Sequence, residues 1–68
     1  MKLSARNVFK GKVLDIKVGP IASKVRVDIG GGNVVTSTIT ADAVDDLGIA
    51  VGDEISVIIK SSSVMLGK

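Results

Sequence analysis

The sequence contains no cysteine, histidine, tryptophan or tyrosine. The absence of cysteine excludes disulfides, thiolate zinc sites and thiol nucleophiles. The absence of histidine removes the commonest neutral metal ligand and general base. The acid–base groups that remain are carboxylates and lysines scattered along the chain, whereas catalysis needs such groups at matched positions. We therefore expect neither an enzyme nor a protein that holds a bare metal cation.

Aromatic residues and excess charge are also scarce. Phe9 is the single aromatic residue, whereas proteins that hold single-stranded nucleic acid stack its bases on aromatic side chains. The net charge is only +2, and the basic residues are interleaved with acidic ones rather than forming a basic stripe. Affinity for nucleic acid is therefore expected to be weak. An OB-type interaction module for nucleic acid or protein is kept as the alternative hypothesis.

The chain is short and apolar. Its 68 residues make one domain, 1–68, of which 46% are hydrophobic, with a mean hydropathy of +0.48. A domain of this size buries a modest share of its surface, and without disulfides or metal its extra stability has to come from association. We therefore expect a homo-oligomer. Residues 1–7 are unlike a secretory signal and no segment has the length of a membrane span, so we expect a cytoplasmic protein with no membrane partner.

Hydrophobic periodicity predicts three strands, a short helix and a last strand. Apolar and polar residues alternate, as in half-buried strands, at Leu14, Ile16 and Val18 and again at Val25, Val27 and Ile29. Turns are predicted at Gly19-Pro20 and at 30–33, and the β-branched run 34–39 is a third strand.

A helix is predicted between this strand and the last one. Thr40 provides an N-cap hydroxyl, Asp42 favours the helix dipole, and Gly48 ends the helix. Residues 55–60 form the last long strand. The predicted class is all-β, a small OB-like β-barrel with one short helix between the third strand and the last long strand.

Hydrogen-bond donors are concentrated at the two ends of the chain. Ser4, Arg6 and Asn7 precede the first strand, and Lys60 and the serines that begin with Ser61 follow the last one. A site built from such donors and from backbone N–H groups suits a fully deprotonated tetrahedral anion. Molybdate, tungstate and sulfate are such anions, whereas phosphate near neutral pH often keeps a proton. Serine and asparagine beside strand ends also commonly satisfy backbone groups, so composition alone leaves both interpretations open.

Segments over the whole chain resemble one known family, the molbindins, also called Mop or molybdenum-pterin-binding proteins. The resemblance lies in the segments Met1-Lys2-Leu3-Ser4-Ala5-Arg6-Asn7, Lys10-Gly11-Lys12-Val13, Asp42-Ala43-Val44-Asp45-Asp46-Leu47-Gly48, Val51-Gly52-Asp53-Glu54 and Ile59-Lys60-Ser61-Ser62-Ser63-Val64-Met65-Leu66-Gly67-Lys68. The family is related to the transport-associated OB domains of molybdate transporters and regulators. The resemblance implies hexamers, trimers of dimers, that bind molybdate or tungstate at subunit interfaces for storage or homeostasis.

The resemblance also implies which residues bind the oxyanion. The residues that match the family's pocket are Ser4, Arg6, Asn7, Lys60, Ser61 and Ser62, and the two groups are implied to meet across subunits. Thr40, at the helix start, is a further candidate for the same pocket, although capping explains it equally well.

A second oxyanion site of the family lies near the threefold axis and uses the turn after the first strand. Gly19, Ile21 and Ala22 are the candidates here, with Ala22 where members often have asparagine. Pro20 has no N–H to donate. Ser23 is an alternative donor in place of the missing asparagine, although it is expected to be a solvated turn serine. No pterin cofactor is expected, because pterin rings call for apolar or aromatic walls with edge donors and acceptors.

Overall fold

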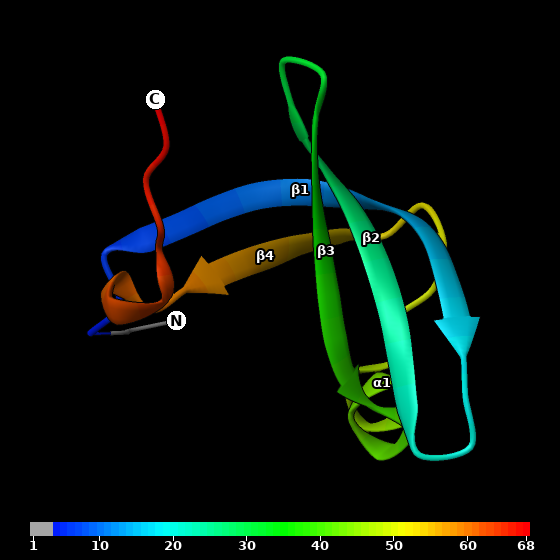
Figure 1. The fold of residues 1–68 in the computed structure, drawn as a ribbon. Coiled ribbons are helices and arrows are strands. Elements are labelled where there is room, and N and C mark those ends of the chain that lie inside the picture. Colours follow the sequence, from blue (N-terminus) through cyan, green and yellow to red (C-terminus); the bar gives the residue numbers. More distant parts are fainter. Residues whose placement is uncertain (1–3) are drawn as a thin grey trace.

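The computed structural model describes residues 4–68 of the chain. Four antiparallel strands form one sheet in the order β3-β2-β1-β4 (Figure 1). The elements are β1 (Asn7–Val18), β2 (Ala22–Gly30), β3 (Asn33–Thr40), α1 (Ala41–Leu47), β4 (Glu54–Ile59) and the 3-10 turn η1 (Ser61–Ser63). The predicted class is confirmed: an all-β, OB-like fold with its short helix between the third strand and the last long one.

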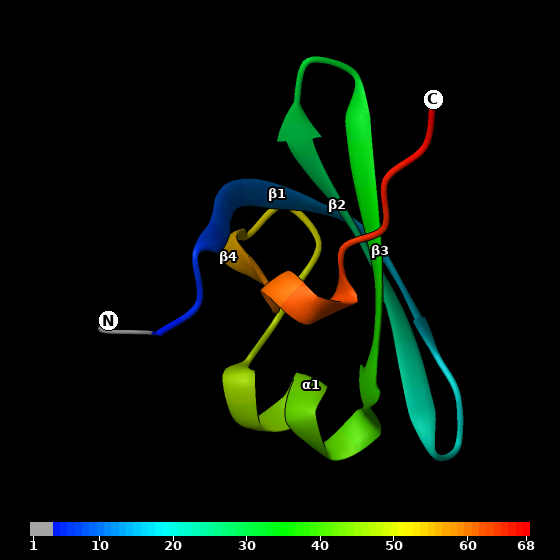
Figure 2. The same ribbon diagram turned by 60° about the vertical axis from the view of Figure 1, so that its left-hand side comes forward.

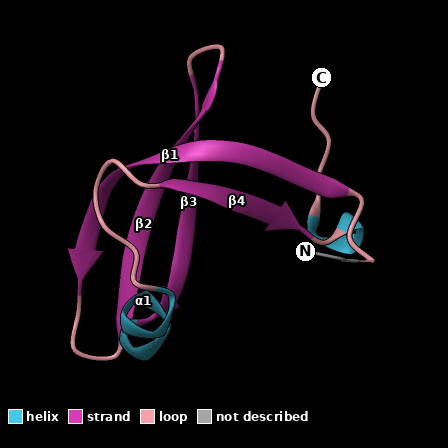
Figure 3. Cartoon of the chain, turned by 180° about the vertical axis from the view of Figure 1, so that it is seen from behind, coloured by secondary structure: helices cyan, strands magenta, loops and turns pink. Residues whose placement is uncertain are grey.

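Strand β1 is twice as long as β4, and it pairs with two different strands. Its second half pairs with β2 and its first half with β4, and Lys12 faces both Asp28 and Glu54. Figures 1 and 3 show β1 curving so that β1 and β4 form an arm that leaves the β2–β3 hairpin. Gly11 lies at this divergence, where an added Cβ would be 2.5 Å from Val27 Cγ1. The bend therefore needs a residue without a side chain.

The prediction of which β1 side chains point inward was wrong in part. Val13 is 1% exposed and lies in the core, whereas Leu14 is 39% and Val18 69% exposed. The register between β1 and β2 shifts between Val13 and Asp15. Such a bulge inserts an extra residue and changes which face the following side chains reach. Ile16 still packs against the core.

The helix prediction is confirmed in its bounds and its caps. Thr40 Oγ1 accepts a hydrogen bond of 3.0 Å from the Ala43 N–H. Gly48 adopts a left-handed conformation with φ 64°, and its N–H bonds to the Asp45 carbonyl. Figure 2 shows α1 beside the end of β3, away from the tip of the β2–β3 hairpin. From there the helix contributes Val44 to the core.

The core is small and much apolar surface is left exposed. Four valines form its buried centre: Val13, Val25, Val27 and Val44. The last apolar residues of the chain are open to solvent, with Met65 92% and Leu66 95% exposed. Within residues 4–68, no helix is long and apolar enough to cross a membrane.

Candidate functional site

The fold brings the two donor-rich segments to the same end of the molecule. Asn7 begins β1 and is the register partner of Ile59, the last residue of β4. The Asn7 side-chain amide donates a hydrogen bond of 3.1 Å to the Ile59 carbonyl. Figures 1 and 3 show the start of β1 and η1 close together at the end of the arm. Residues 4–6 and 60–62 therefore leave adjacent strands from the same rung of the ladder.

A tight turn displays the carboxy-terminal donors. Lys60 precedes η1 with an extended backbone, and its carbonyl accepts a 2.9 Å bond from the Ser63 N–H. Lys60, Ser61 and Ser62 are all exposed. Within residues 4–68, no hydrogen bond uses the hydroxyl of Ser61 or Ser62. These groups are available to a ligand.

The amino-terminal donors are equally accessible. Ser4 and Arg6 are exposed, and Asn7 is half-buried. In the described part of the chain, the only ion pair joins Arg26 to Asp15 at 3.1 Å, so the charges of Arg6 and Lys60 are not neutralised there. An exposed anion near both cations would gain two charge-assisted hydrogen bonds.

Thr40 does not join these donors within the chain. It lies at the end of β3, opposite Ala22 of β2, and its hydroxyl caps α1. The Ala41 N–H bonds to the Ile21 carbonyl at 3.1 Å. Thr40 is thus grouped with the turn between β1 and β2, where the candidates for the second site lie.

The turn itself is closed by its own backbone. The Gly19 N–H donates to the Ala22 carbonyl at 2.9 Å, which leaves that N–H engaged. A shallow pocket beside the turn is lined by Gly19, Ala22 and the lysines Lys17 and Lys24, among others. An anion there would meet positive charge, although without a side-chain amide at position 22.

The expectation that Ser23 is a solvated turn residue was wrong. Ser23 belongs to β2 and is only 1% exposed. It lies on the same face of the strand as Val25 and Val27, and the residues between them lie on the exposed face. Its hydroxyl is buried and finds no hydrogen-bond partner within residues 4–68. Its position two residues before Val25, in the same alternation, was the sequence signal for this burial.

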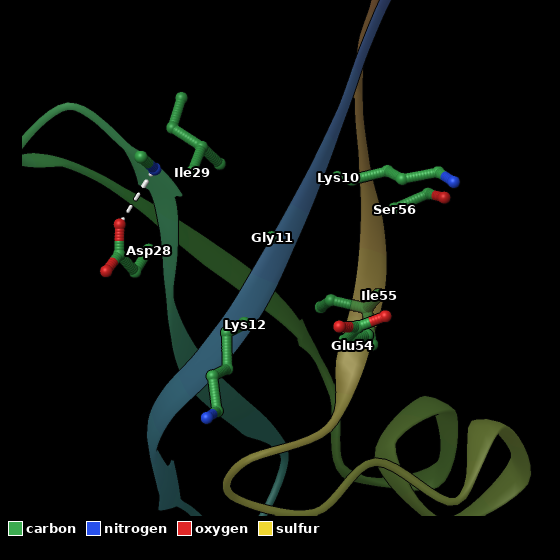
Figure 4. A pocket seen from close by; sticks show the side chains of 9 residues that line it. Lys10, Gly11, Lys12, Asp28, Ile29, Glu54, Ile55 and Ser56 are labelled. Atoms are coloured by element: carbon green, nitrogen blue, oxygen red, sulfur yellow. Dashed lines mark hydrogen bonds between the residues drawn. The ribbon is translucent and has the colours of Figure 1, made fainter.

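A further hollow lies away from both groups of candidate residues. It opens where β1 leaves β2, over Gly11, and it is lined by Lys10, Lys12, Asp28 and Glu54, among others (Figure 4). In Figure 4 the Lys10 and Ser56 side chains extend in the same direction from β1 and β4. Two lysines and two carboxylates give this hollow no net charge, so it does not select an anion. Residues 4–68 also contain no group of three or more acidic residues placed to hold a metal ion.

The chain is similar to known proteins over almost its whole length. The model of the TOBE domain matches residues 3–66, which makes this a TOBE-domain protein with an OB-like fold. A probable molybdenum-pterin-binding protein of Haemophilus influenzae is 52% identical over 67 residues, 98% of this chain and 97% of that protein. The chain belongs to the molbindin family.

Two solved structures share the fold, each with a TM-score of 0.93. The molybdate-binding protein of Sporomusa ovata is 31% identical, with all of both chains covered. The cytoplasmic molybdate-binding protein ModG, solved with molybdate bound, is 40% identical over 98% of this chain. The chain spans about half of ModG, 48% of its length.

Proposed function

We propose that this protein binds molybdate, or the similar anion tungstate, at the end of the β1–β4 arm. The observation that carries the proposal is the Asn7–Ile59 rung, because the two donor-rich segments, residues 4–6 and 60–62, leave adjacent strands from it. The names of the Sporomusa ovata protein and of ModG, both molybdate-binding proteins, support the choice of ligand. Asn7 follows the amino-terminal donors directly, and its register partner Ile59 directly precedes Lys60.

The chemistry of these donors supports a dianionic oxyanion. Lys60 and Arg6 offset two negative charges, and serine hydroxyls and backbone N–H groups complete the shell of donors. A protonated phosphate would place its own donor against these groups. Sulfate presents the same chemistry as molybdate at a smaller size, so the width of the closed site separates the two.

Binding takes place between subunits of a homo-oligomer, a hexamer built as a trimer of dimers. The exposed positions of Ser61 and Ser62 support this, because one chain alone does not enclose an ion there. The exposed apolar residues Val8, Ile58, Met65 and Leu66 support association. An ion held between chains couples ligand binding to assembly.

The role is storage or homeostasis of the oxyanion in the cytoplasm, without catalysis. ModG, which shares the fold, is described as cytoplasmic. The ligand is the bare oxyanion rather than a pterin, since no aromatic side chain lies among the donor residues. Nucleic acid is not a partner, because Phe9 is the only aromatic side chain on which a base could stack.

A second, weaker oxyanion site uses the turn of Gly19, Ile21 and Ala22, with Thr40 beside it. Lys17 and Lys24 in the adjoining pocket support an anion there. The engaged Gly19 N–H and the alanine at position 22 reduce the number of donors, so this site is expected to fill after the first.

Isothermal titration tests the proposal, with molybdate, tungstate, sulfate and phosphate as separate titrants and with mass measured by light scattering in the same buffer. We expect tight binding of molybdate and tungstate to an oligomer, and weak binding of sulfate and phosphate. A pterin and a single-stranded oligonucleotide serve as comparison ligands and are expected to give no heat. Absence of molybdate heat at every concentration would refute the proposal.

A further inference from the structure

The side-chain amide of Asn7 is already engaged within the protein. Its Nδ2 donates to the Ile59 carbonyl at 3.1 Å, in a partly buried contact between residues 52 positions apart. Ser4, Arg6, Lys60, Ser61 and Ser62 are all exposed, whereas Asn7 is half-buried. Asn7 thus differs from the other residues of the proposed site in both its burial and its contacts.

The bond fixes the backbone immediately before Lys60. Ile59 is held by Asn7, and the Lys60 carbonyl is held by the Ser63 N–H at 2.9 Å. The backbone of Lys60 is therefore restrained from both sides, while its long side chain is free to reach a ligand. Without the first restraint, the end of β4 would fray and the lysine would explore more directions.

The chemistry of an amide agrees with a role other than direct binding. One of its two N–H donors is used by Ile59, and its carbonyl oxygen is an acceptor that a dianion repels. A hydroxyl or an ammonium does not bring this disadvantage. An amide that is bonded to the neighbouring strand and half-buried also avoids the repulsion between its oxygen and the anion.

We infer that Asn7 is a positioning residue that acts through Ile59 to direct Lys60 toward the oxyanion. This inference rests on the proposed function and assigns Asn7 a role within it. A direct ligand and a positioning residue both weaken binding when replaced, so a single substitution cannot separate them. The two roles are separated by testing whether the effect of replacing Asn7 depends on the presence of Lys60.

The first experiment compares Asn7→Leu with Asn33→Leu by titration with molybdate. Asn33 is a matched control because its Nδ2 also donates to a carbonyl, that of Gly30, at 3.2 Å, but at the tip of the β2–β3 hairpin. We expect Asn7→Leu to raise the Kd about fivefold, the worth of one hydrogen bond, and Asn33→Leu to leave it unchanged. Circular dichroism checks that both variants are folded, and Asn7→Ala replaces Asn7→Leu if that variant is not.

The second experiment is a double-mutant cycle with Lys60→Ala. If Asn7 acts through Lys60, its replacement costs little once the lysine is absent. We expect the double variant to bind molybdate at least threefold more tightly than the product of the two single losses predicts. If Asn7 is an independent ligand, the losses multiply.

The outcomes are distinct. A double variant closer to the product than threefold, or weaker than it, overturns the inference, and so does an unchanged Kd in Asn7→Leu. In either case wild-type binding leaves the proposed function intact. A wild-type protein that gives no heat with molybdate overturns the proposed function and this inference together.

Discussion

At the scale of single residues, Lys60 is one of the two cations of the proposed site. Lys60 is exposed, it is in no ion pair within residues 4–68, and it begins the turn that displays Ser61 and Ser62. Its ammonium is a compact, strongly hydrated charge that binds an oxyanion as a point charge. We therefore expect Lys60 to contribute to the affinity of the proposed site for the oxyanion.

Replacement of Lys60 by alanine is expected to weaken molybdate binding by roughly 1.5–3 kcal/mol, about 10- to 150-fold in Kd, because a charge-assisted hydrogen bond is lost. Titration calorimetry measures the change. Lys10→Ala is the control, because it removes the same charge from the same arm, opposite Ser56 and away from the turn. Equal losses in both variants would point to net charge rather than to a direct contact.

At the scale of elements, the folding of the sheet depends on the point where β1 leaves β2 for β4. Gly11 allows this divergence, because a Cβ there would meet Val27 Cγ1 at 2.5 Å and the Asp28 carbonyl at 2.8 Å. The arm formed by β1 and β4 carries the proposed site at its far end. The arm that carries the donors therefore begins at the bend that Gly11 allows.

Gly11→Ala is expected to lower the free energy of unfolding by about 1–3 kcal/mol, since the close contact includes backbone that cannot move freely. Urea unfolding measures the loss. Gly67→Ala is the control, because nothing lies within 4 Å of a Cβ at that position. An equally stable Gly11→Ala variant would mean that the strands adjust without cost.

The helix provides a second test at this scale. Thr40→Ala removes the hydroxyl that accepts from the Ala43 N–H and should cost about 1 kcal/mol of stability. Thermal unfolding measures it as a melting temperature lower by roughly 4–8 °C. Thr40→Ser keeps the cap and should remain within about 2 °C of the wild type. A similar loss in both variants would assign the effect to the methyl group instead.

At the scale of the whole molecule, stability and assembly are expected to be linked to the ligand. The buried centre consists of four valines, while Met65 and Leu66 are almost fully exposed. Such a chain becomes more stable when a second copy of the chain packs against its exposed apolar surface.

Molybdate at about 100 times its Kd is expected to stabilise the folded assembly by roughly 2.7 kcal/mol. Scanning calorimetry with and without the anion measures the shift, and light scattering over a dilution series reports the mass. Sulfate at the same concentration is the control and should shift the melting temperature less. A mass of 7.0 kDa that does not change with dilution or ligand would contradict the expected assembly.

The sequence alone determined the class of fold and the order of its elements. Alternation from Val25 to Ile29, the β-branched run 34–39, the Thr40 cap and Gly48 are local signals, and local signals fix local structure. The family could also be predicted from the sequence, because its motifs at the two ends are runs of consecutive residues.

Tertiary structure decided what depends on contacts between distant residues. The bulge at Leu14, which put Val13 in the core, arises from pairing with β2 and leaves no signal in an alternating pattern. The separation of Thr40 from Lys60 and the Asn7–Ile59 bond likewise depend on register across strands. A periodic sequence shows which faces a strand has, but only the assembled sheet fixes which residues stand opposite one another.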